Sequence, residues 1–349
     1  MLALVSIDSL VPERHILRQV KPLVDSILRD LSPTFDAMYA QDGRPSVPPE
    51  RLLKAMLLMA FFSVRSERML CEQIGYNMLF RWFLDMDLTE AAFDATTFTK
   101  NRDRLLEHDV AGEFFRAIVE HSRSQGWLSS EHFSADGTLI ESWASMKSFR
   151  PKDDDSGDNN GFGDFKGTKR KNDTHESKTD PDAKLIRKGR GREAKLAYVG
   201  HALMENRNGL AVGFELTEAN GRAEPEAALD MLQGEQARKG SMKPRRITVA
   251  ADKAYDTAAF VRRCRELRVT PHVAQFIAKN RGSRIDGRTT RHPGYAMSTR
   301  ARRLIEKIFG WMKTVGGIRR SRFRGREKTA FAATIVTAAY NLLRMGGAA

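Results

Sequence analysis

The order of the predicted strands and helices after residue 130 most constrains what this chain can fold into. Apolar periodicity predicts a strand over 131–142 and a two-stranded hairpin over 195–219. Beyond the hairpin, helices and strands alternate: a helix over 224–239, a strand over 245–252, a helix over 256–268, a strand over 270–276, and helices over 298–317 and 327–345. Three antiparallel strands followed by helical crossovers to parallel strands make a mixed sheet with flanking helices. The sequence therefore predicts an α/β domain over residues 126–349.

The first third of the chain carries helical patterns only. Helices are predicted throughout residues 13–125, and the one over 93–108 contains three basic residues, Lys100, Arg102 and Arg104, interpreted as a basic face. A short helix, a turn and a basic helix resemble the helix-turn-helix arrangement of DNA-binding proteins, although a basic face can also be an ordinary solvated surface. We therefore expect residues 1–125 to form an all-helical DNA-binding region.

A polar segment over 150–192 interrupts the predicted α/β domain. It is rich in glycine and nearly free of branched apolar residues, and its acidic residues cluster before its basic ones. Such a composition buries too little apolar surface to fold on its own, which predicts a mobile insertion. The basic end of the segment could still contact phosphates when DNA is bound.

The charge of the chain indicates a polyanionic partner. Its 58 Lys and Arg residues against 44 Asp and Glu residues give a formal net charge of +14, and nucleic acid is the first candidate for such a partner. An anionic membrane surface would require a basic amphipathic helix beside an anchor, and the most apolar window, 52–64, is too short to span a bilayer. Two cysteines are too few for a disulfide framework. We expect a reduced, cytoplasmic protein without a signal peptide.

Two acidic residues follow strands that the predicted topology can place side by side. Asp136 is expected at the end of the first strand and Asp252 at the end of the fourth. Adjacent parallel strands lie about 4.8 Å apart, so both carboxylates would reach one divalent cation. Glu306 is the candidate third acid, because it lies at the margin of an apolar helical stripe with Arg302 and Lys313 on the same side.

The three acids suit a metal site for phosphodiester chemistry. Mg²⁺ and Mn²⁺ prefer oxygen ligands and need no His or Cys cage, and two ions roughly 3.5–4 Å apart can stabilise the attacking and leaving oxygens. Each acid also has a plain structural interpretation: Asp136 can belong to an Asp-Gly turn, Asp252 can cap the next helix, and Glu306 can pair with Arg302 or Arg303. The combination of all three in a strongly basic chain favours the metal site.

Four segments of the chain resemble one protein family. The runs DGTLIESWASMKSF, THESKTDPDAKL, ADKAYDT and RRLIEKIFGWMKTVGGIRRSRFRG closely resemble bacterial insertion-sequence transposases of the IS-Five group, which are DDE transposases. The resemblance covers most of the chain. It implies a ribonuclease-H-like catalytic fold, a metal-binding triad of Asp136, Asp252 and Glu306, and terminal inverted repeats as the cognate DNA.

The same resemblance includes a departure from the family pattern. The family's spaced Tyr, Arg, Glu and Lys pattern maps onto Arg302, Glu306 and Lys313, but Thr299 stands at the Tyr position.

Further basic and aromatic residues are candidate DNA contacts. Lys253, Arg319 and Arg320 could contact phosphates, although Lys253 could equally be a surface base. Trp143 and Trp311 could stack on flipped bases, but core packing is the favoured interpretation for both.

Together these features predict a DNA transposase that cuts DNA with metal-activated water and joins the freed 3′ hydroxyl to target DNA. We expect a homodimer or larger assembly on DNA, in the bacterial cytoplasm and at the nucleoid when bound. One alternative is a metal-dependent nuclease of the same fold that only hydrolyses DNA. Another is a DNA-binding repressor with an inactive catalytic centre.

Overall fold

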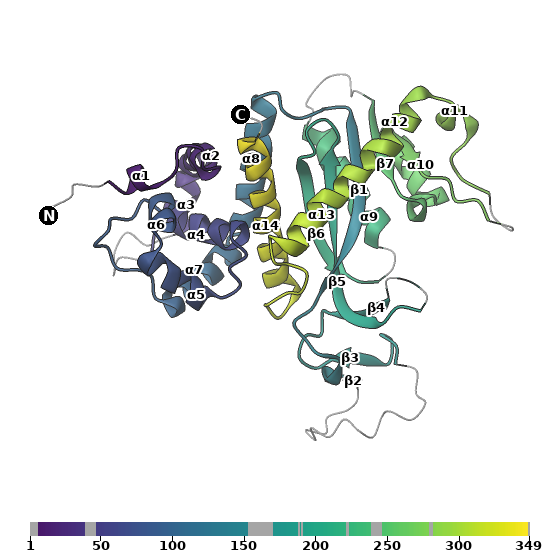
Figure 1. Ribbon diagram of the computed structural model, residues 1–349. Helices are drawn as coiled ribbons and strands as arrows, with labels where there is room; N and C mark the ends of the chain where they lie inside the picture. Colours follow the sequence, from purple (N-terminus) through teal and green to yellow (C-terminus); the bar gives the residue numbers. More distant parts are fainter. Residues whose placement is uncertain are drawn as a thin grey trace.

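The computed structural model describes residues 6–38, 47–152, 170–187, 189, 191–220, 223–238, 246–278 and 282–347. An all-helical N-terminal part precedes a sheet flanked by helices, as predicted (Figure 1). The N-terminal helices are α1 (Ile7–Leu10), α2 (Leu17–Asp30), α3 (Ser32–Met38), α4 (Pro49–Phe61), α5 (Glu67–Tyr76), α6 (Met78–Phe83), α7 (Ala95–Glu107) and α8 (Val110–Ser124).

The central helix of the N-terminal part is α4, which is buried on nearly all sides. Proline stands at its first position, where a missing amide hydrogen costs no helical hydrogen bond. The chain breaks between α5 and α6 at Asn77, whose side chain accepts hydrogen bonds from the amides of Leu79 and Phe80 and so caps the second helix. Asp94 caps α7 in the same way, by accepting a hydrogen bond from the Thr97 amide.

The remaining elements confirm the predicted alternation. The strands are β1 (His132–Glu141), β2 (Phe149–Pro151), β3 (His175–Ser177), β4 (Lys184–Arg187), β5 (Ala194–Glu205), β6 (Ala211–Glu218), β7 (Ile247–Ala251) and β8 (Val269–Val273). The helices are α9 (Ala223–Arg238), α10 (Ala258–Glu266), α11 (Gly287–Thr290), α12 (Pro293–Ala301), α13 (Ile305–Thr314) and α14 (Arg326–Gly346), with short 3₁₀ turns η1 (Met146–Ser148), η2 (Lys253–Tyr255) and η3 (Arg302–Leu304).

Within the described residues, the main sheet is a mixed one of six strands. Its order is β4-β5-β1-β7-β8, with β6 also paired to β5. β5 runs antiparallel to β1, β4 and β6, whereas β7 runs parallel to both β1 and β8. This arrangement is the ribonuclease-H-like mixed sheet that was expected, with the first strand beside the fourth of the sequence-predicted set.

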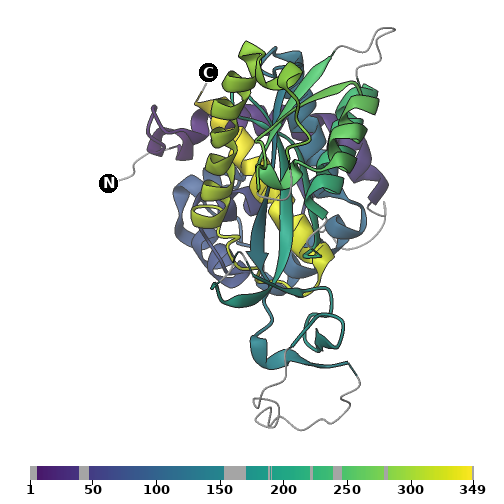
Figure 2. The ribbon, with the colours of Figure 1, turned by 90° about the vertical axis from the view of Figure 1, so that its right-hand side faces the viewer.

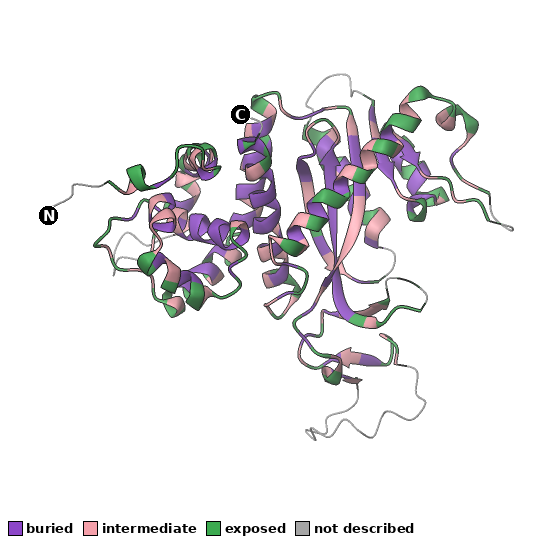
Figure 3. Cartoon of the chain, viewed as in Figure 1, coloured by how far each residue is buried: buried purple, intermediate pink, exposed green. Residues whose placement is uncertain are grey.

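Helices cover both faces of the main sheet (Figure 2). α9 and α10 pack together on one face, and α12, α13 and α14 cover the other. α14 also packs against α8 and α4, so it joins the helical N-terminal part to the sheet. Figure 3 shows that buried residues concentrate along α14 and the inner strands, which form one continuous core. None of the described helices is long and apolar enough to cross a membrane.

The predicted mobile insertion over 150–192 is partly structured. Residues 153–169, 188 and 190 lie outside the described residues, but β3 pairs with β2, and β4 joins the edge of the main sheet. The polar composition concealed side-chain anchors: the Asn172 side chain bonds both backbone groups of Leu185, and buried Asp180 accepts a hydrogen bond from the Tyr198 hydroxyl at 2.6 Å. Polar anchoring therefore replaces the apolar burial that the segment lacks.

Candidate active site

The sequence predicted Asp136 at the end of the first strand, but the residue lies in the middle of β1. The parallel pairing of β1 with β7 stops at Ser134, but pairing with β5 on the other edge continues to Glu141 and keeps the strand extended. The parallel neighbours themselves are as predicted. Ser134 stands opposite Ala250, so a step of two residues along each strand brings Asp136 level with Asp252.

Asp252 directly follows β7 and also caps the next turn. Its Oδ1 accepts a hydrogen bond from the Ala254 amide at 2.7 Å, so the capping role that the sequence allowed is present. The hydrogen bond engages one carboxylate oxygen and fixes the side chain next to the sheet. Ligation of a metal ion through the other oxygen is compatible with that cap.

Asp136 occupies a half-buried position among other charges. Its Oδ1 accepts a hydrogen bond from the Gly137 amide at 2.8 Å, and its Oδ2 lies 3.7 Å from an Arg302 guanidinium nitrogen. Burial raises the pKa of Asp136, and the negative charges of Asp252 and Glu306 raise it further, while the Gly137 amide and Arg302 oppose the shift. The predicted triad thus shares one electrostatic environment.

Glu306 lies in the first turn of α13, beside the face that packs on the sheet. The predicted apolar stripe is confirmed, because Ile305, Ile308, Phe309 and Met312 are buried. Glu306 itself is exposed. Its helix continues from the 3₁₀ turn that carries Arg302, and α13 packs against β1. The helix therefore carries the third acid to the strand that holds Asp136.

The described residues contain no group of three His, Cys, Asp or Glu side chains that is already close enough to hold a metal ion. The donor set nevertheless fits a hard divalent cation, because Asp136 and Asp252 offer carboxylate oxygens at the same level of neighbouring strands. Burial is the largest cause of the raised pKa of Asp136, and the negative charges of Asp252 and Glu306, which a cation would neutralise, add to it.

Glu224 is a further acidic residue at this site, and the sequence analysis missed it. It lies in the first turn of α9, on the opposite face of the sheet from α13. Gly137 makes room for it: a Cβ atom at Gly137 would lie 2.8 Å from Glu224 Oε1. Burial raises the pKa of Glu224, and the charges of Asp136 and Asp252 add to the shift. The described residues provide no hydrogen-bond or ion-pair partner for its carboxylate.

Gly137 was the sequence signal that could have indicated the close approach of Glu224 to β1. A glycine inside a strand often marks the close approach of another group to the backbone. In the sequence, however, Asp136-Gly137 also fitted a simple turn, and nothing singled out Glu224 among the acids of its helix.

Most of the predicted DNA-contacting basic residues are accessible to solvent. The exposed ones are Lys100, Arg104, Lys253, Arg319 and Arg320, and Lys313 is half-buried. Lys253 adjoins Asp252 in the chain, and Arg302 contacts Asp136, so these two lie at the acidic site. Arg319 and Arg320 lie on the loop after α13, where Arg320 donates hydrogen bonds to the carbonyls of Ser142 and Trp143 at 3.1 and 2.8 Å.

The predicted basic face over Lys100, Arg102 and Arg104 is wrong. Arg102 is buried and forms ion pairs with Glu67 and Asp103. Residues two apart on an α-helix point about 200° away from each other, so Arg102 faces the core while its two neighbours face solvent. Arg102 stabilises the contact between α7 and α5.

The two tryptophans differ in their surroundings. Trp311 packs edge-on against Tyr340 with ring centroids 5.9 Å apart, which confirms the expected core packing. Trp143 is 43% exposed, so the core packing expected for it is wrong. It follows β1 at a bend where the strand leaves the sheet. Thr299, at the position of the family's Tyr, donates a hydrogen bond to the Tyr295 carbonyl.

Two protein families match this chain over most of its length. Residues 5–104 match a family described as a transposase domain, DUF772, and residues 167–342 match the transposase DDE domain family. The second match includes Asp252 and Glu306, whereas Asp136 precedes it. A search of curated proteins gave no match.

Among solved structures, the chain is similar to the piggyBac transposase in a synaptic complex with hairpin DNA, with 10% identity over 95% of this chain and 75% of that one and a TM-score of 0.44. It is also similar to the Mos1 transposase in a paired-end complex, with 11% identity over 80% and 82% of the chains and a TM-score of 0.21. Since the DDE-domain match spans half of the chain, together with a transposase domain before it, this protein belongs to the DDE transposase family.

Proposed function

We propose that this chain binds the terminal inverted repeats of an insertion sequence, cleaves the DNA with metal-activated water and joins the freed 3′ hydroxyl to target DNA. The observation that carries the proposal is the level placement of Asp136 and Asp252 on parallel strands, with Arg302 and the Glu306 helix against them. We assign a bacterial cytoplasmic location, and a homodimer or larger assembly on DNA, because two transposon ends must be processed together.

Asp136, Asp252 and Glu306 would hold two divalent ions, Mg²⁺ or Mn²⁺. When bound, such ions supply the Lewis-acid stabilisation of the attacking and leaving oxygens of the phosphodiester. The chain's own residues have separate tasks. Arg302 orients Asp136 from the helix side, and the Gly137 amide orients it from the strand. Lys253 and Lys313 contact phosphate oxygens and hold the scissile strand beside the carboxylates.

The two parts of the chain divide the work. Residues 1–125 would bind the repeats through exposed cations such as Lys100 and Arg104, and residues 126–349 would perform the chemistry. Arg319 and Arg320 extend the basic surface along the loop after α13. Contacts of this kind make DNA binding strongly dependent on salt concentration.

The direct test uses purified full-length protein, Mg²⁺ or Mn²⁺, and the DNA segment that flanks its own gene, with broken and joined ends mapped by sequencing. We expect metal-dependent breaks at inverted repeats and joined products, both lost in Asp136→Ala. Breaks without joined products would favour a nuclease that only hydrolyses DNA. Binding without breaks under either metal would favour a repressor with an inactive centre.

The role of Glu306 needs a variant that keeps the shape of the side chain. Glu306→Gln should keep repeat binding and abolish cleavage, because it removes a metal ligand but little else. Glu327→Gln, which changes an exposed acid of α14, is the matched control and should cleave normally. If Glu306→Gln cuts at the wild-type rate, Glu306 is not the third acid.

A further inference from the structure

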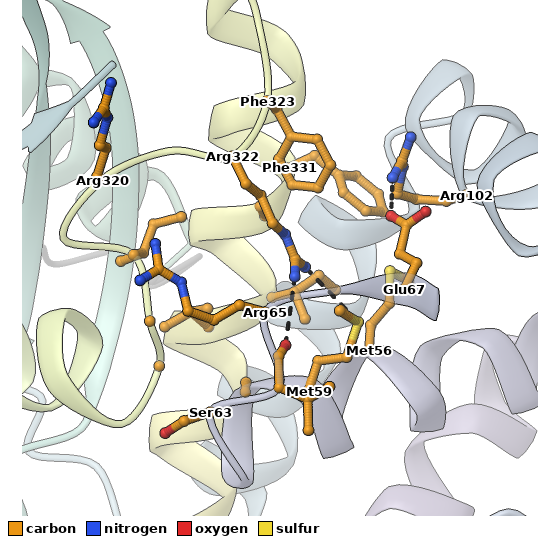
Figure 4. Close-up of a pocket in the computed structure, with 18 of the residues that line it drawn as sticks. Met56, Met59, Ser63, Arg65, Glu67, Arg102, Arg320, Arg322, Phe323 and Phe331 are labelled. Carbon is orange, nitrogen blue, oxygen red and sulfur yellow. Dashed lines mark hydrogen bonds and ion pairs between the residues drawn. The ribbon is translucent and has the colours of Figure 1, made fainter. Parts of the chain in front are cut away.

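A basic groove lies where the helical N-terminal part meets the loop between α13 and α14. Arg65, from the segment after α4, and Arg320 and Arg322, from that loop, line two adjoining cavities. Figure 4 shows the inner cavity, which is lined by apolar side chains such as Met56, Met59 and Phe331, with Arg65 and Arg320 at its border and Arg322 pointing into it. The groove proper is the outer cavity, which has a volume of about 580 Å³.

The lining of the groove is basic, hydroxylated and aromatic. Besides the three arginines, it consists of the hydroxyl residues Ser145, Thr179 and Ser321, and Trp143. No carboxylate is among the described residues that line it. Arg322 and Ser321 are turned inward, where the Ser321 hydroxyl donates a hydrogen bond to the Phe323 carbonyl. The guanidinium groups of Arg65 and Arg320 and the hydroxyls of Ser145 and Thr179 are the donors suited to phosphate oxygens. The volume lies within the range of about 300–1,000 Å³ that is usual for ligand sites.

No acidic side chain of the inner cavity forms an ion pair with the arginines of the groove, among the residues that the structure describes. Arg322 points inward, where its guanidinium lies 3.4 Å from the Val64 carbonyl oxygen and 3.7 Å from the Met59 sulfur (Figure 4). Glu67, the one acid among the described residues that line the inner cavity, forms an ion pair with Arg102, although its charge also acts on Arg322. Burial lowers the pKa of Arg322 to about 10, so it remains charged at neutral pH. The groove therefore has excess positive charge that a bound anion would balance.

Trp143 gives the groove an aromatic surface on a backbone that is hydrogen-bonded to the loop before α14. The Arg324 guanidinium lies 4.6 Å from the ring centroid, and Arg320 donates hydrogen bonds to the carbonyls of Ser142 and Trp143 itself. The backbone that carries the indole is thus fastened to the loop before α14. A large, partly exposed aromatic ring beside arginines is an arrangement that stacks nucleic-acid bases.

We propose that this groove binds an unpaired nucleotide of the DNA substrate, with the base stacked on Trp143 and its phosphate held by Arg65 and Arg320. The inference rests on the proposed function, because it takes DNA as the ligand. It adds a binding site for a single-stranded or flipped-out nucleotide that is separate from the acidic site. Trp143 follows β1, the strand that carries Asp136, so one strand of the protein leads from the acidic site to the groove.

The first test compares affinities of Trp143→Ala and wild type for a single-stranded oligonucleotide and for its duplex, without metal. Base stacking on an aromatic side chain is worth about 5- to 150-fold in affinity per base, so Trp143→Ala should weaken single-strand binding by that factor and duplex binding much less. Trp143→Phe should restore part of the loss. Trp127→Phe, which lies outside the groove, is the control and should bind like wild type. Equal affinity of Trp143→Ala and wild type for the single strand would overturn the proposal.

A second test needs no substitution. A duplex with one unpaired 2-aminopurine should lose fluorescence when wild-type protein binds, because stacking on an indole quenches the probe; unchanged or increased fluorescence would overturn the proposal. Free thymidine monophosphate distinguishes the source of the nucleotide: if it binds as tightly as the oligonucleotide, the groove is a mononucleotide site and the DNA assignment is wrong. Wild-type protein that binds neither DNA form would instead refute the proposed function itself.

Discussion

His201 allows the electrostatics of the catalytic sheet to be tested quantitatively. It lies on β5 directly opposite Gly137 of β1 and is 1% exposed. One ring nitrogen, Nε2, lies 2.7 Å from the Thr217 hydroxyl, while Nδ1 is buried without a hydrogen-bond partner among the described residues. Burial lowers the pKa of His201 to about 4, because the imidazolium cannot be solvated there.

The sign of the pH dependence follows from this shift. In the unfolded chain His201 is protonated below about pH 6.5. Between that pH and about 4, His201 therefore binds a proton in the unfolded state but stays neutral in the folded state. The stabilising contribution of neutral His201 is therefore complete above about pH 6.5 and is lost as the pH falls towards 4. At about 1.4 kcal/mol per pH unit, acidification to about pH 4.5 should reduce the free energy of unfolding by about 2.5 kcal/mol through this residue alone.

The assay is urea denaturation of wild type and His201→Gln near pH 7 and near pH 4.5. Glutamine does not titrate, so the stability difference between the two proteins should shift in favour of the variant by about 2.5 kcal/mol on acidification. His108→Gln, which changes an exposed histidine, controls for effects of histidine loss in general. A difference between wild type and His201→Gln that does not change with pH would show that His201 is already able to hold a proton in the folded sheet.

Three further outcomes can be measured on single variants. Gly316→Ala should lower the free energy of unfolding by about 1–3 kcal/mol in urea denaturation, because the new Cβ would lie 2.4 Å from a methyl carbon of Val336 in α14. Glu224→Gln should weaken Mn²⁺ binding in calorimetry, whereas Glu226→Gln, an exposed acid of the same helical turn, should not. Lys253→Gln should reduce the slope of log affinity for duplex DNA against log salt concentration by about 0.9, the value for one lost phosphate contact; an unchanged slope would place Lys253 away from the DNA.

The sequence was sufficient for the sheet because strand order follows from local patterns. A hairpin after the first strand and helical crossovers afterwards leave few ways to arrange the strands. The sequence could therefore predict that β1 and β7 are parallel neighbours. The position of Asp136 within β1 could not, because it depends on how far β5 continues to pair beyond β7. Strand ends are set by the partner strand as much as by the residues of the strand itself.

Side-chain surroundings were less predictable, for reasons that differ from residue to residue. Helical geometry alone separates Arg102 from its two basic neighbours, because residues two apart face different sides of a helix. Trp143 carried no local sign of exposure, because its position depends on hydrogen bonds from Arg320, which is 177 residues away in the chain. Glu224 reaches the site only because Gly137, on another element, has no side chain.

The charges around Asp136 explain why a strongly basic chain keeps several acids in one place. Two of the charges that act on Asp136, those of Asp252 and Glu306, oppose its ionisation, and Arg302 alone among the side chains named with them favours it. Glu224 adds negative charge from the other face of the sheet. Within a half-buried site, this repulsion costs more than it would in water, so the arrangement is unfavourable for folding by itself. A divalent cation is attracted by every one of these carboxylates, so the charges that raise the pKa values of Asp136 and Glu224 are the charges that would bind it, and the basic surface beyond them would hold the DNA.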